Sequence, residues 1–220
     1  MANQTRINLL QAEVDENDQS FFRLLVDGQA IKYITEDMCF GPSLASLLPR
    51  LPTGDWNDGL VARDEKDGQP CFTRACRTAF PGVKDTWHGT YADCTDIVVG
   101  EKLRTGIYEV KGHMFGPGDA GVAAKFARFD WEIQYIENET TAYQWIDGHN
   151  IGPRFLGHLT KDARVIGFLM ERITNARHAD PQDLEPCQQT LSRLHCLGIR
   201  HGDITISIDL TSSFAVRRLF

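Results

Sequence analysis

Alternating apolar and polar positions dominate the first part of the chain and predict β-strands. Residues 20–35 contain two β-prone runs on either side of Asp27-Gly28, a pair that is typical of a hairpin turn. A further strand is expected within residues 70–80, and a short helix within residues 43–48. This first part is therefore expected to be rich in strands.

A denser strand pattern starts near Asp96. It sets a soft boundary between a β-rich N-terminal extension, residues 1–94, and a second region, residues 95–204. The second region is expected to contain strands at 96–103, from 107, at 122–129, at 154–159 and at 164–170, with turns at 104–106 and 116–119.

Helical spacing of apolar positions appears twice in this second region. One helix is expected from Trp131 to about Ile146, with Asp130 as its N-cap. A second is expected to begin near Pro186 and to stop at Gly198, a residue type that commonly follows the last turn of a helix. Strands followed by a helix, a strand pair and a second helix give an α+β fold class.

The net charge, the first residues and the cysteine spacing argue against several kinds of partner, location and metal site. A formal net charge of −7 gives no electrostatic reason to expect nucleic acid or an anionic membrane. The first residues lack an apolar signal core, and no run approaches the roughly 20 apolar residues of a membrane span. The six cysteines lack Cys-x-x-Cys spacing and are expected to be reduced thiols rather than zinc ligands. We therefore expect an intracellular, cytoplasmic protein with no metal site built from cysteine.

The most specific motif lies at residues 194–204, which read Leu-His-Cys-Leu-Gly-Ile-Arg-His-Gly-Asp-Ile. This segment resembles the catalytic loop of the protein-kinase-like superfamily, in the His-Gly-Asp form of aminoglycoside phosphotransferases. The resemblance covers about residues 95–204, and the layout with an extension is similar to fungal kinase-like proteins. It implies a kinase-like small lobe, an antiparallel sheet plus an αC-type helix, followed by a fragment of the large lobe. It also implies ATP-dependent transfer of phosphate to a hydroxyl, with Asp203 as the catalytic base.

The same resemblance assigns residues to nucleotide binding. Val122-Ala123-Ala124-Lys125 resembles the Val-Ala-x-Lys segment of a kinase strand, in which Ala123 would lie near adenine and Lys125 would reach the phosphates. Spacing alone is also compatible with a solvated lysine on an edge strand.

A helix glutamate is needed to position that lysine. Glu139 is the candidate, with Glu132 as its rival, and a solvated glutamate on the helix flank is the plain alternative. By the same resemblance Met170 is the residue that closes the back of the nucleotide pocket, and the backbone near Glu171 and Ile173 would contact adenine.

Departures from the family pattern argue for impaired catalysis. Ile208 stands where the resemblance requires a Mg²⁺-binding asparagine, and residues 205–220 form a non-matching tail without a second metal-binding aspartate. Gly100 and Gly106 do not make a glycine-rich phosphate loop, so binding of ATP and Mg²⁺ is expected to be weak. We expect either an impaired phosphotransferase, truncated after the catalytic loop, or a pseudokinase that serves as an interaction module for a protein partner.

A truncated large lobe would leave apolar side chains without a cover. The expected exposed apolar patch comprises Leu191, Leu194 and Ile199.

Overall fold

The computed structural model describes residues 5–15, 17–37, 49–113, 115, 121–174, 176–200 and 207–209. The chain divides into two compact units, Met1–Phe80 and Pro81–Phe220. Its described residues combine strands and helices, so the α+β class is confirmed. The helix expected at 43–48, the turn at 116–119 and the His201–Asp203 motif lie outside the described residues.

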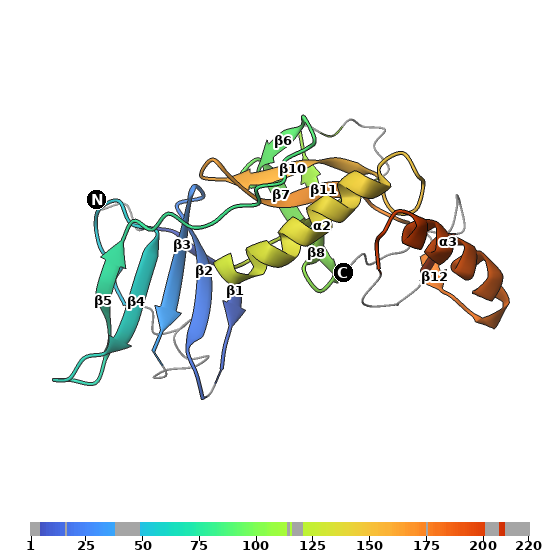
Figure 1. Ribbon diagram of the computed structural model, residues 1–220. Helices are drawn as coiled ribbons and strands as arrows, with labels where there is room; N and C mark the ends of the chain where they lie inside the picture. The colour runs from blue at the N-terminus through green and yellow to red at the C-terminus, as the bar shows by residue number, and fades with distance from the viewer. Residues whose placement is uncertain are drawn as a thin grey trace. The chain divides into compact units, whose positions relative to one another are not determined.

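The first unit is a single five-stranded sheet in chain order (Figure 1). Its strands are β1 (Ile7–Glu13), β2 (Ser20–Val26), β3 (Ala30–Glu36), β4 (Asp58–Arg63) and β5 (Pro70–Cys76). The predicted β2–β3 hairpin is confirmed, and its turn uses positive φ angles at Asp27 (50°) and Gly28 (72°). Among the described residues of this unit, one buried cluster comprises Phe22, Leu24, Ile34 and Val61.

The second unit is built on a six-stranded sheet of order β6-β10-β11-β9-β8-β7. The strands are β6 (Tyr91–Asp93), β7 (Ile97–Arg104), β8 (Ile107–Gly112), β9 (Val122–Phe126), β10 (Phe155–Lys161) and β11 (Arg164–Glu171). A separate pair joins β12 (Ala176–His178) to β13 (Ser207–Asp209). Strands β7, β8, β9, β10 and β11 agree with those predicted, with ends that differ by a few residues, whereas β6, β12 and β13 were not predicted.

Helix α2 (Ile133–Ile146) covers one face of the six-stranded sheet (Figure 1). Successive residues of a strand point to opposite faces, and the buried side chains divide accordingly. Ala123 and Phe168 pack with Ile136 and Tyr143 of α2, whereas Ala124 and Leu169 belong to a second cluster on the other face. Both faces of the sheet are therefore packed.

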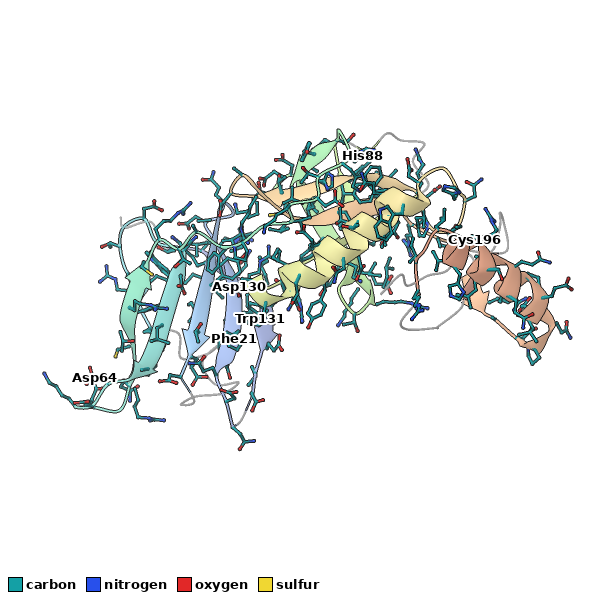
Figure 2. All side chains as sticks on the ribbon, in the orientation of Figure 1. Phe21, Asp64, His88, Asp130, Trp131 and Cys196 are labelled. Atoms are coloured by element: carbon teal, nitrogen blue, oxygen red, sulfur yellow. The ribbon has the colours of Figure 1, made fainter. Side chains whose placement is uncertain are left out.

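The start of α2 differs from the prediction, because Asp130 is not its N-cap. Asp130 opens a 3₁₀ turn, η2 (Asp130–Glu132), beside Trp131 (Figure 2). The Glu132 carboxylate instead reaches back and accepts the N–H groups of Arg128 (2.6 Å) and Phe129 (3.4 Å). A longer acidic side chain thus satisfies the amides that precede the helix, and this role accounts for Glu132, the rival of Glu139.

Helix α3 (Leu184–Cys196) follows a 3₁₀ turn, η3 (Pro181–Asp183), and so begins before Pro186. Its predicted end is confirmed. Gly198 has a φ of 78°, and the N–H groups of Gly198 and Ile199 donate to the carbonyls of His195 (2.9 Å) and Leu194 (3.3 Å). This bonding pattern is the Schellman helix ending.

The expected exposed apolar patch on α3 is wrong. Leu194 is 0% exposed and Ile199 is 2% exposed, and both belong to the cluster that α2 shares with the sheet. Leu191 is partly buried against the same cluster. The helix ending brings Ile199 back toward Leu194, and both side chains are buried within the second unit.

The two units divide at Phe80 and Pro81, earlier than the soft boundary near residue 94. Residues 81–94 belong with the second unit because β6 pairs in parallel with β10, with Tyr91 opposite His158. Val83 is also buried in the cluster under α2. Composition alone did not reveal this edge strand, which is only three residues long.

Candidate functional site

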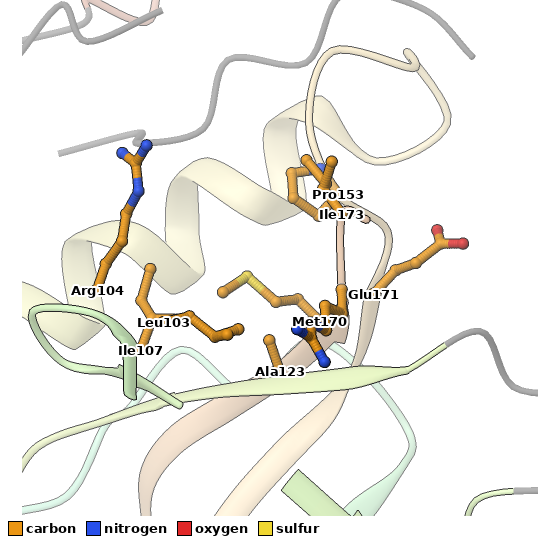
Figure 3. A pocket seen from close by; sticks show the side chains of 9 residues that line it. Leu103, Arg104, Ile107, Ala123, Pro153, Met170, Glu171 and Ile173 are labelled. Carbon is orange, nitrogen blue, oxygen red and sulfur yellow. The ribbon is translucent and has the colours of Figure 1, made fainter. Parts of the chain in front are cut away.

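A pocket of about 190 Å³ opens between the β7–β8 turn and the end of β11 (Figure 3). It is lined by Leu103, Arg104, Ile107, Ala123, Pro153, Met170, Glu171, Arg172 and Ile173. Four of these residues, Ala123, Met170, Glu171 and Ile173, are among those that the kinase resemblance assigns to the nucleotide pocket. Sites for whole drug-sized ligands are larger, about 300–1,000 Å³, so this pocket matches a single ring system.

Strand pairing brings the floor of the pocket together. Ala123 lies directly opposite Met170 in the β9–β11 pair, and Ile107 lies opposite Lys125 in the β8–β9 pair. Figure 3 shows the Met170 thioether reaching across the pocket above the Ala123 methyl group, while the Glu171 carboxylate points away from the pocket. The small Ala123 side chain leaves the floor open.

Beside this floor, Lys125 and Glu139 form the predicted ion pair between β9 and α2. Ala123 and Lys125 share one face of β9 because they are two residues apart. The side chains of Lys125 and Glu139 are only 13% and 6% exposed. Such a pair is poorly hydrated, so the two charges depend on each other and not on solvent.

Tyr143, one turn after Glu139 on α2, connects the helix to the pocket. Its hydroxyl lies 3.3 Å from the Met170 sulfur, within hydrogen-bond distance, and its side chain is buried. Burial, followed by the nearby Glu139 charge, raises the pKa of Tyr143 far above its ordinary value, so the phenol stays neutral. The contact fixes Met170 against α2.

The β7–β8 turn lies close to the lysine. Gly106 has a φ of 72°, and a Cβ atom added there would be 3.9 Å from Lys125 Cε. The strands on either side stay paired, with Arg104 opposite Ile107. A tight turn of this kind offers few backbone N–H groups to phosphates, in agreement with the poor glycine pattern.

Residues that sequence reasoning missed hold the segment after β11 in place. The Arg172 guanidinium pairs with Glu109 at 2.8 Å, and the Arg172 N–H donates to the Gly121 carbonyl at 3.1 Å. The Glu171 N–H donates to the Arg154 carbonyl at 2.9 Å. These contacts join elements far apart in sequence, and no local motif indicates them.

The structure gives no position for the predicted catalytic residue relative to the pocket. Asp203 lies outside the described residues, and Ile208 is described only as a member of β13, where it pairs with Arg177. Within the described part of the chain, no group of three or more His, Cys, Asp or Glu side chains is arranged to hold a metal ion.

Neither protein-family models nor curated protein sequences match this chain. Among the described helices, none has the length and apolar character needed to cross a lipid bilayer.

Proposed function

We propose that this chain is a kinase-like protein whose second unit binds an adenine nucleotide, with impaired phosphate transfer. The observation that carries the proposal is the buried Lys125–Glu139 pair beside a pocket lined by Ala123 and Met170. In protein kinases a strand lysine paired with a helix glutamate is the arrangement that holds the α- and β-phosphates.

The order of elements supports the proposal. Strands β7, β8 and β9 precede α2, strands β10 and β11 follow it, and α3 comes next. Three strands, a helix, two strands and a further helix are the order of a kinase small lobe and the start of its large lobe. The sequence after α3 then reads His201-Gly202-Asp203.

The residues of the pocket suit an adenine base, and Lys125 suits its phosphates, whereas Ile208 does not suit a metal ion. The apolar walls and the small Ala123 suit a planar ring, and the backbone of Glu171 and Ile173 would contact its polar edge. Lys125 would bind the phosphates, and Glu139 would orient the lysine. ATP would supply the phosphoryl group, and Mg²⁺ would neutralise its charge, but Ile208 cannot ligate a hard cation.

The proposal is tested by calorimetric titration of the full chain with adenosine and with ATP. We expect both ligands to bind. Lys125→Met should lower the affinity for ATP at least tenfold and leave the affinity for adenosine unchanged, because the lysine interacts only with the phosphates. Lys111→Met, at an exposed position on β8, is the matched control and should change neither. Absence of binding of either ligand at millimolar concentration would exclude the proposal.

A further inference from the structure

Residues 83–88, called here the 83–88 segment, run alongside α2 and bond to it three times. The Lys84 N–H donates to Glu137 Oε2 (2.8 Å). The Thr141 hydroxyl donates to Asp85 Oδ2 (2.7 Å). The Trp87 indole N–H donates to the main-chain carbonyl of Thr140 (3.1 Å).

The same segment is also tied to the sheet at both ends. At its start the Val83 N–H donates to the Val165 carbonyl of β11 at 2.8 Å. At its end the His88 N–H donates to the Nε2 atom of His158 on β10 at 3.2 Å. The 83–88 segment therefore links the helix that carries Glu139 to the sheet that carries Lys125.

The hydrogen bonds from the 83–88 segment reach the turn of α2 that carries Glu139. Glu137, Thr140 and Thr141 surround Glu139 within one helical turn, so fixing them fixes the rotation and the height of Glu139. Apolar packing alone lets helices slide over a sheet in small shear motions, whereas directional hydrogen bonds select one position.

Packing of the Trp87 ring adds a second connection. The ring lies 4.7 Å from that of Phe155, which stacks on Phe168 at 5.4 Å. Phe168 is the residue directly opposite Lys125 in the β9–β11 pair. Trp87 is thus connected to Glu139 through Thr140, and to Lys125 through Phe155 and Phe168.

We infer that the 83–88 segment positions α2 for the Lys125–Glu139 pair, with Trp87 as its principal positioning residue. The role in nucleotide binding rests on the proposed function above, whereas the effect on the ion pair does not. The segment lies within the second unit, two residues after Pro81, where that unit begins.

The test uses Trp87→Phe in the full chain, which removes the indole N–H but keeps an aromatic ring against Phe155. Acylation of lysines by an amine-selective reagent, read by mass spectrometry, reports how firmly Lys125 is held. In Trp87→Phe we expect Lys125 to be acylated roughly 2- to 10-fold faster, which is the effect of one lost hydrogen bond. Glu139→Gln removes the charged partner of Lys125 and is the reference for a faster reaction. Thr141→Val, which removes the bond to Asp85, should act in the same direction.

Two controls separate positioning from general damage. Trp145→Phe makes the same substitution at a half-exposed tryptophan of α2 and should leave Lys125 unchanged. Lys161, 6% exposed on β10, should keep its low reactivity in every variant. The inference would be overturned if the acylation rate of Lys161 rose in parallel with that of Lys125. It would also be overturned if the acylation rate of Lys125 stayed unchanged in both Trp87→Phe and Thr141→Val.

Nucleotide titration of Trp87→Phe adds the functional readout. The affinity for ATP should fall roughly 2- to 10-fold and the affinity for adenosine should stay the same, because the Lys125–Glu139 pair would interact with the phosphates. If the unaltered chain binds neither ligand, the proposed function fails, and the lysine reactivity still decides the inference.

Discussion

At the scale of single residues, Gly167 is the position where packing leaves least room. It lies in the middle of β11, opposite Phe126. A Cβ atom added there would overlap the Lys125 carbonyl oxygen and would lie 2.7 Å from Phe126 Cα. The obstructing atoms are mostly backbone, so they cannot move aside without disturbing the β9–β11 pair that carries the site.

We therefore expect Gly167→Ala to lower the free energy of unfolding by about 1–3 kcal/mol or more. Gly89→Ala is the matched control, because an added Cβ atom meets nothing within 4 Å there, and it should change stability by less than about 0.5 kcal/mol. Urea unfolding followed by circular dichroism measures both. Equal stability of the two variants would contradict the packing described for β9 and β11.

His158 is the residue whose environment predicts a dependence on pH. Its side chain is completely buried, and burial, followed by the neighbouring His88, lowers its pKa, against a smaller opposing effect of Asp85. A histidine with a depressed pKa stabilises the fold above its unfolded pKa of about 6.5, and this stabilisation is lost as the pH falls through the folded pKa.

Acidification from pH 7.5 to 5.5 should therefore lower the melting temperature of the second unit. The drop should shrink in His158→Gln, which retains a hydrogen-bonding side chain but does not titrate. Thermal melts of both proteins at the two pH values provide the measurement. A drop of equal size in the variant would assign the acid sensitivity to other groups.

At the scale of elements, the helix endings show what sequence can and cannot predict. The end of α3 was predictable, because a positive φ at Gly198 is a local requirement that a single glycine meets. The start of α2 was not, because the amides before it are satisfied by Glu132 and not by the expected Asp130. Both choices are chemically reasonable in sequence, and the three-dimensional path of the chain decides between them.

The candidate site divides in the same way. Ala123, Lys125 and Met170 were assigned from a motif, and strand alternation explains why they meet. The Glu109–Arg172 ion pair and the bond from Trp87 to α2 join distant segments, so no spacing rule indicates them. Local rules therefore predicted residues that the structure places at the pocket and in the ion pair beside it, but not the contacts that hold them in position.

The ending of α3 can be tested by substitution at Gly198. Alanine is strained at a φ of 78°, so Gly198→Ala should cost about 1–2 kcal/mol. Gly198→Asn should cost less, because asparagine tolerates the left-handed region better. Chemical unfolding of the two variants tests this order. A reversed order would show that the buried contact of Leu194 with Ile199, and not the backbone, determines the ending.

At the scale of the whole molecule, the kinase resemblance behind the proposed nucleotide site implies an incomplete set of Mg²⁺ ligands. With Ile208 at the position of the Mg²⁺-binding asparagine, bound nucleotide is expected without efficient transfer. An assay of ATP hydrolysis and phosphate transfer should find no magnesium-dependent turnover above that of Asp203→Asn. Turnover that this substitution abolishes would establish an active enzyme with a metal site built from other residues.

The division into two units, each with its own buried cluster, predicts unfolding in two steps. Ile34 is 1% exposed in the core of the first unit, and Leu159 is 0% exposed in the second. Truncation of a buried Leu or Ile to Ala typically costs 2–5 kcal/mol, and the cost is confined to the cooperative unit that contains it.

Differential scanning calorimetry of the full chain should therefore show two transitions. Ile34→Ala should lower one of them and Leu159→Ala the other. Because a ligand stabilises only the folded unit that binds it, ATP should raise the transition that responds to Leu159→Ala and leave the other unchanged. A single transition that both substitutions lower would mean that the two cores unfold together as one cooperative structure.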